Sequence, residues 1–186
     1  IGAVADVLER EGIRLLSSVE LLAEQLAEPG AMTRRKPSSA QREDLAYGVK
    51  VARTLTRLDL GQTVVIKDRA AVALEAMEGT DEVIRRAGRL AGPGTSVVKL
   101  AKPRQDLRFD VPVVGAGTLL AMREAGAAVL AVEAGCTLLL DREAALAAIP
   151  GLLPNSKDER RRALAAVQEV LTASAEISGE VAKRLK

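Results

Sequence analysis

Short apolar runs alternate along this chain with longer stretches in which apolar residues recur at helical spacing. The clearest runs lie at 63–66, 96–101 and 127–132, and they are rich in the aliphatic residues that favour buried strands. The stretches between them are amphipathic, as expected of helices that cover one face of a sheet. This alternation predicts an α/β fold in which a mixed β-sheet is flanked by helices.

The same spacing predicts individual elements. Apolar periodicity indicates helices near 3–11, 17–26, 38–58, 83–91 and 118–124. Asp68-Arg69 separates two short apolar runs and predicts a β-hairpin made of 63–66 and 70–76. Residues 107–114 are predicted to be extended, and Pro112 favours an edge position for this segment.

Changes in composition divide the chain into four segments. Residues 1–28 follow a helix–strand–helix pattern, with the strand at 13–16, which we interpret as the end of an α/β unit whose beginning is absent. Residues 29–40 contain Pro, Gly and a basic run and are typical of a linker. Residues 41–150 carry the predicted α/β domain, and 156–186 predict a long C-terminal helix at near-heptad spacing.

Composition excludes several kinds of chemistry. The sequence has no His, a single Cys (Cys136) and 1% aromatic residues. A Ser–His triad, a structural zinc site and an internal disulfide are therefore excluded, and aromatic stacking on nucleic acid nearly so. The net charge of +2 is spread along the chain, so we expect no nucleic-acid partner. An unpaired Cys, with no long apolar run or signal sequence, favours a cytoplasmic protein.

The first candidate site is the segment 105–110. If it is extended, Asp106, Arg108 and Asp110 share one face, ~6.6 Å apart from the ~3.3 Å rise per residue. Two carboxylates with an arginine between them suit a metal-bound phosphate, because carboxylates bind hard cations and arginine pairs with phosphate oxygens. The alternative is a solvated strand face with cross-strand ion pairs, and the spacing alone favours that alternative.

The second candidate is Glu78-Gly79-Thr80-Asp81, a glycine turn ahead of a predicted helix. Free amides at a helix N-terminus favour an anion. The alternative is ordinary capping by Thr80, with Asp81 in the first turn, and the local evidence favours that alternative. Glu78 has no predicted capping role and is therefore the more informative residue.

Basic residues supply further candidates. Lys99 and Lys102 lie at the end of a predicted strand, where they could receive a phosphate or act as solubilising edge residues. Arg34 lies in the basic run of the linker and could clamp an anion, although such a run is more often solvated. The glycines of Gly115-Ala116-Gly117 form only part of a nucleotide-binding fingerprint.

Several of these strings occur together, in order, in one known family. They are Asp59-Leu60-Gly61-Gln62, Glu78-Gly79-Thr80-Asp81, the segment 99–112, and Val132-Glu133-Ala134-Gly135 ahead of Leu139-Leu140-Asp141. Over residues 30–145 the sequence resembles the LpxI-type UDP-2,3-diacylglucosamine pyrophosphatases of lipid A biosynthesis in Gram-negative bacteria.

The resemblance implies an amino-terminal Rossmann-like domain, of which 1–28 would be a remnant, ahead of a catalytic α/β domain at 41–150. It implies hydrolysis of an acylated UDP-glucosamine, UDP-2,3-diacylglucosamine, to UMP and 2,3-diacylglucosamine 1-phosphate (lipid X). It also implies a divalent cation, Mg²⁺ or another such as Mn²⁺. The implied location is cytoplasmic or peripheral at the inner-membrane surface, where the acylated substrate sits.

The matching residues receive roles from the same resemblance. The catalytic group would be Asp106, Arg108 and Asp110, and the metal ligands Glu78, Asp81 and Asp106. The substrate contacts would be Lys99, Lys102, Gln62 and Thr80, to which the linker adds Arg34. A non-catalytic nucleotide-sugar or anion-binding module is the alternative function, and the helix at 156–186 is a candidate for forming a homodimer.

Overall fold

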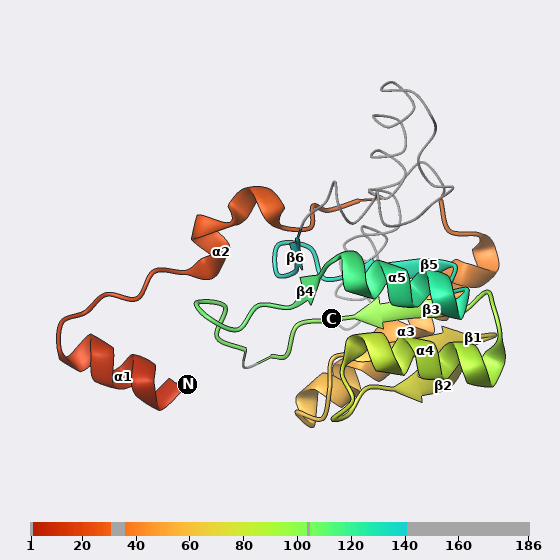
Figure 1. Cartoon of the computed structure of the whole chain (residues 1–186), viewed down its shortest axis with the longest axis horizontal. Helices are drawn as coiled ribbons and strands as arrows, with labels where there is room; N and C mark the ends of the chain where they lie inside the picture. Colours follow the sequence, from red (N-terminus) through yellow and green to blue (C-terminus); the bar gives the residue numbers. More distant parts are fainter. Residues whose placement is uncertain (1, 31–35, 104, 141–186) are drawn as a thin grey trace, which may run out of the picture.

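The computed structural model describes residues 2–30, 36–103 and 105–140. Its centre is a four-stranded sheet in the order β2-β1-β3-β5 (Figure 1). The strands are β2 (Ala70–Leu74), β1 (Thr63–Lys67), β3 (Ser96–Lys99) and β5 (Val129–Val132). β1 runs antiparallel to both of its neighbours, whereas β3 and β5 are parallel. The sheet is therefore mixed.

Three helices cover the two faces of this sheet. They are α3 (Ser39–Arg57), α4 (Thr80–Ala91) and α5 (Ala116–Ala125). Side chains alternate across a strand, so Val64 and Val98 face α3 while Val65 and Val97 face α4 and α5. Figure 1 shows α4 and α5 side by side on one face of the sheet. The predicted fold class, a mixed sheet flanked by helices, is confirmed.

Local sequence explains where two of these elements begin and turn. Ser38 and Gln41 form a reciprocal capping box that starts α3, with hydrogen bonds of 2.9 and 3.2 Å. Asp68 and Arg69 adopt positive φ angles of 52° and 59°, the backbone geometry of a tight turn between antiparallel strands. The predicted hairpin is confirmed.

A smaller parallel pair, β4 (Val113–Val114) and β6 (Leu138–Leu139), lies beside the main sheet. The amino-terminal arm (residues 2–30) contains α1 (Gly2–Arg10), α2 (Ser18–Leu21) and a 3₁₀ helix (Ala23–Gln25). Its end joins the smaller pair, because the Ala27 N–H donates to the Thr137 carbonyl at 2.8 Å. Figure 1 shows α1 well away from the main sheet.

Two predictions of extended structure are wrong. Residues 13–16 form no strand; Ile13 and Leu16 are more than half exposed, and the segment has no neighbouring strand to pair with. Within 107–114 only Val113–Val114 is a strand, since a turn at 106–110 replaces the expected extended run. The helix expected at 17–26 is split into α2 and the 3₁₀ turn.

Several predictions lie outside the described residues. They include Arg34 and the long C-terminal helix at 156–186. Among the described helices, none combines the length and the apolar character that crossing a bilayer requires.

Candidate active site

Many of the predicted site residues gather at one edge of the main sheet. The parallel strands β3 and β5 end there, at Lys99 and Val132. β1 begins there, at Thr63, because it runs antiparallel to β3. α4 also begins there, since Thr80 contacts both Thr63 and Lys99. Ligands of open α/β sheets bind outside the carboxyl ends of the strands, so this edge is the candidate active site.

Lys99 lies inside this edge rather than on its surface. Its side chain is 5% exposed, and Nζ donates to Thr80 Oγ1 at 2.8 Å and to the Val113 carbonyl at 2.9 Å. Burial lowers the pKa of the ammonium group, opposed by the nearby carboxylates Glu75 and Asp81. The structure therefore gives Lys99 an internal role, joining α4 to β4. Its contact with substrate stays a prediction.

Glu75 completes this buried network and was missed by the sequence analysis. One carboxylate oxygen accepts from the Gln62 N–H at 3.1 Å, and the other accepts from the Thr80 hydroxyl at 3.1 Å. Gly61 permits this approach, because a Cβ there would lie 2.2 Å from the Glu75 carbonyl oxygen. The one sequence signal for this contact is Gly61, because a glycine allows the backbone at Glu75 to approach closely.

Asp81 fixes the start of α4 against α5. Its carboxylate accepts a hydrogen bond from the Thr118 hydroxyl at 2.7 Å. A Cβ at Gly117 would lie 3.1 Å from the same carboxylate, so the partial glycine fingerprint serves close helix packing here. Gly79, with φ of 82°, is the N-cap of α4. The prediction that Thr80 is the N-cap is wrong, because Thr80 is the first helical residue.

Asp106 and Arg108 pair directly with each other. Asp106 Oδ1 accepts from the Arg108 backbone N–H at 3.0 Å, and its carboxylate accepts from the Arg108 guanidinium at 2.7–3.1 Å. The Asp110 N–H closes the turn onto the Asp106 carbonyl at 2.8 Å. The expected alternation of these three side chains on a strand is wrong, because an aspartate competes for nearby backbone donors and favours a turn.

This pairing fixes the charge of both groups. The guanidinium hydrogen bonds lower the pKa of Asp106. The same bonds, with the one that Arg108 donates to the Glu9 carboxylate, raise the pKa of Arg108. Asp106 is therefore a carboxylate and Arg108 a cation at neutral pH.

The amino-terminal arm reaches this turn. The Ser18 N–H and hydroxyl both donate to the Arg108 carbonyl, at 3.1 and 2.6 Å, and Glu9 pairs with the Arg108 guanidinium. Residues from outside the α/β layers thus take part in positioning the 105–110 turn.

Glu78 has a structural contact that the sequence did not predict. Its carboxylate accepts from the Ala76 N–H at 2.9 Å and from the Arg86 guanidinium at 2.5 Å. A hydrogen bond from its own backbone N–H, followed by that from Arg86, lowers the pKa of Glu78. Glu78 therefore closes the turn ahead of α4. Its hydrogen-bond partners, Ala76 and Arg86, differ from those of Asp81 and Asp106.

Lys102 and Asp110 line a cavity beside this edge. Lys102 Nζ donates to Asp59 Oδ1 at 2.6 Å, and its backbone N–H donates to Gln105 at 2.9 Å. A cavity of about 670 Å³ has Lys102, Asp59 and Asp110 among its walls. Of the three catalytic candidates, Asp110 lines this cavity, which lies beside the C-terminus of α3.

A bound cation is the least specified part of the site. Among residues 2–30, 36–103 and 105–140, no group of three or more Asp, Glu, Cys or His side chains is placed to hold a metal. Mg²⁺ commonly uses only one or two protein carboxylates when substrate phosphates supply the other ligands. Asp106 and Asp110, which lie on one turn, fit that smaller requirement. Glu78, Asp81 and Asp106 form no such group among the described residues, and the metal roles of Glu78 and Asp81 stay predictions.

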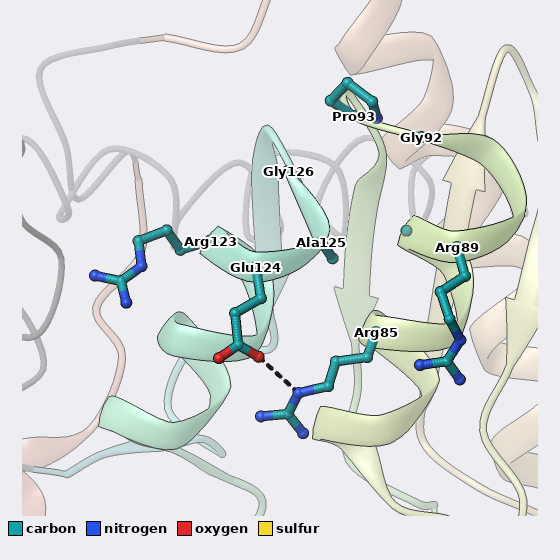
Figure 2. A pocket seen from close by; sticks show the side chains of 9 residues that line it. Arg85, Arg89, Gly92, Pro93, Arg123, Glu124, Ala125 and Gly126 are labelled. Carbon is teal, nitrogen blue, oxygen red and sulfur yellow. Dashed lines mark hydrogen bonds and ion pairs between the residues drawn. The ribbon is translucent and has the colours of Figure 1, made fainter.

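A second cavity lies between α4 and α5, toward their C-termini (Figure 2). Its volume is about 470 Å³, and Arg85 on its wall forms a 2.8 Å ion pair with Glu124. Arg89 is likewise paired, with Glu82 at 3.0 Å. This end of α4 lies opposite the candidate site, because the Ala91 carbonyl accepts from Lys67 at the far end of β1. None of the predicted site residues that the structure describes is on its walls.

Comparison with known proteins identifies the family. The model of the LpxI C-terminal domain matches residues 28–151. The chain belongs to the LpxI family. The LpxI match begins close to the predicted start of the linker at residue 29 and covers every described residue of the candidate site except those in the arm.

Two relatives match parts of the chain. UDP-2,3-diacylglucosamine pyrophosphatase LpxI of Caulobacter vibrioides is 34% identical over 157 residues, which are 80% of this chain and 56% of that protein. An uncharacterized protein of the ackA 5′ region of Rhizobium meliloti is 55% identical over 49 residues, 26% of this chain and 7% of that protein. The chain thus spans little more than half of the LpxI relative.

Proposed function

We propose that this chain carries the catalytic part of a hydrolase that cleaves the pyrophosphate bond of UDP-2,3-diacylglucosamine, giving UMP and 2,3-diacylglucosamine 1-phosphate. The observation that carries the proposal is the Asp106–Arg108 pair, held in a turn beside a cavity at the carboxyl edge of the sheet. Membership of the LpxI family and the name of the Caulobacter relative support the choice of substrate.

The reaction needs a water molecule, a proton acceptor and cations. The water oxygen forms a bond to one phosphorus, and the bridging P–O bond breaks with its electron pair leaving on the other phosphate. Asp106, kept ionised by Arg108, would orient the water and accept its proton. Arg108 would stabilise the negative charge that develops on the phosphoryl oxygens. This chemistry requires no histidine.

A divalent cation, Mg²⁺ or Mn²⁺, would be held by Asp106 and Asp110 together with substrate phosphates, and it would neutralise charge on the pyrophosphate. Lys102 lines the cavity that Asp110 also lines, and there it would contact a phosphate. Gln62, Thr80 and Lys99 would act from the edge of the sheet, by supporting the substrate contacts. We further propose a cytoplasmic site of action at the inner-membrane surface, because the substrate is acylated.

The test is release of UMP from UDP-2,3-diacylglucosamine by the whole protein and by its Asp106→Asn variant. Loss of the proton acceptor should lower the rate by about 100-fold or more, with the circular dichroism spectrum unchanged. Asp68→Asn is the matched control, because Asp68 is an exposed aspartate in the hairpin turn at the other end of β1 and asparagine tolerates its positive φ.

Asp68→Asn should keep the wild-type rate. Undiminished turnover by Asp106→Asn would remove Asp106 from the reaction. Saturable binding of the UDP-sugar by the wild type without any UMP release would instead support the non-catalytic binding module.

A further inference from the structure

Two adjoining cavities lie beside the C-terminus of α3. Their volumes are about 670 and 410 Å³. The walls that they share are Thr56, Arg57, Lys102, Pro103 and Gln105. They therefore offer one extended surface with two halves, next to the turn that holds Asp106 and Arg108.

The two halves differ in charge. Among the described residues, the smaller cavity has Arg53, Arg57 and Lys102 on its walls, with Glu133 as the carboxylate. That carboxylate already accepts the Ala101 N–H at 3.1 Å. The larger cavity balances Arg57 and Lys102 with Asp59 and Asp110. An anion is therefore favoured in the smaller half.

Arg57 is the cation best placed to receive that anion. Lys102 is paired with Asp59 at 2.6 Å, whereas the guanidinium of Arg57 has no hydrogen-bond or ion-pair partner within the described part of the chain. Arginine presents donors in a planar fork that matches two phosphate oxygens. Arg57 ends α3, so its backbone is held by a long helix while its side chain lines both cavities.

We infer that the smaller cavity binds a phosphate monoester, the phosphate of the nucleotide, with Arg57 as its principal ligand and Lys102 as the second cation. The inference rests on the proposed function for the identity of the nucleotide, UMP, but the chemistry of the cavity walls carries it. Arg57 lies outside the Asp59–Gln62 string and was not among the residues predicted from the sequence.

Cys136 provides a reporter of occupancy that does not depend on catalysis. It lines the smaller cavity and is the only cysteine of the sequence. Burial, with a further contribution from Glu133, raises the pKa of its thiol. Because Cys136 lines the cavity, its alkylation by N-ethylmaleimide at constant pH reports access to the cavity. Mass spectrometry of the Cys136 peptide measures the extent of alkylation in the whole protein.

The experiment compares UMP with uridine, which lacks the phosphate. UMP should slow alkylation of Cys136 and uridine should not. Arg57→Gln should need roughly 10- to 100-fold more UMP for the same protection, because a charged hydrogen-bonding partner is lost. Arg57→Lys should fall between the two. Lys50→Gln is the matched control: it removes one cation from the same helix but lies outside both cavities.

Equal protection by uridine, or an unchanged UMP requirement in Arg57→Gln, would overturn the inference. Arg57 is exposed, so its variants should fold; a normal circular dichroism spectrum checks this. Failure of the proposed function is distinguishable. Protection by UMP through Arg57 in a protein that hydrolyses no UDP-2,3-diacylglucosamine would keep the phosphate site and remove the reaction. If Arg57→Gln hydrolyses the substrate with an unchanged KM, and UMP does not protect Cys136, the reaction stands and the phosphate site is removed.

Discussion

At the scale of single residues, the site depends on charges that are positioned by other polar groups. Lys99 is held by Thr80 and by a backbone carbonyl, and Glu75 by Thr80 and the Gln62 N–H. A buried ion costs several kcal/mol unless its hydrogen bonds are satisfied. The network satisfies them, and in doing so it fixes the start of α4 against β4.

Replacing Lys99 tests this network. Lys99→Met should lower the free energy of unfolding by about 1–3 kcal/mol, because buried oxygens lose a charged donor. Lys50→Met, on the exposed part of α3, should change it by less than about 0.5 kcal/mol. Urea denaturation followed by circular dichroism measures both.

The pH dependence of the stability difference between the wild type and Lys99→Met gives a second test of the buried Lys99. Because burial lowers the pKa of Lys99 below its usual 10.5, the unfolded chain binds more protons than the folded protein in the interval beneath that value. Stability contributed by Lys99 therefore rises with pH in this interval. The wild type should gain stability relative to Lys99→Met as the pH approaches 10.5, and a constant or falling difference would contradict the assignment.

Elements of the fold were predictable where the determinants were local. The Ser38–Gln41 capping box and the Asp68-Arg69 turn each act within a few residues, so the sequence alone predicted α3 and the hairpin. The prediction of a strand at 13–16 was wrong because a strand needs a neighbouring strand, and apolar character alone does not supply one.

The candidate site was predicted only in part for the same reason. Its residue types and its position after β3 could be predicted, since Lys99, Lys102 and Asp106 follow one strand. Glu75 and Arg57 could not, because they approach from β2 and α3 and only the tertiary fold brings them to this edge. The mutual pairing of Asp106 and Arg108 was hidden by the assumption of an extended backbone.

Packing between α4 and α5 depends on the absence of a side chain. A Cβ at Gly88 would lie 2.7 Å from Ala125, so the two helices could not approach as closely. Gly88→Ala should therefore lower the free energy of unfolding by about 1–3 kcal/mol through overpacking, although alanine is the better helix former by about 1 kcal/mol.

Gly2→Ala is the control, because a Cβ at Gly2 meets nothing within 4 Å. It should leave thermal stability unchanged or slightly raised. Equal melting temperatures for wild type and Gly88→Ala would show that the contact between the two helices is less close than the structure has it.

At the scale of the whole molecule, a three-layer α/β/α unit presents one edge to which distant segments contribute. Strand ends supply Lys99, the loop after β3 supplies Asp106 and Arg108, and the amino-terminal arm holds that loop through Ser18 and Glu9. The LpxI relative from Caulobacter is nearly twice as long as the region that it shares with this chain.

The central claim is that this edge hydrolyses a pyrophosphate, and oxygen-18 water tests it most directly. The whole protein is incubated with UDP-2,3-diacylglucosamine in labelled water, and both products are analysed by mass spectrometry. We expect one labelled oxygen per turnover, carried by either UMP or the sugar phosphate, and loss of this incorporation in Asp106→Asn. Products without label, or equal labelling by the variant, would contradict it.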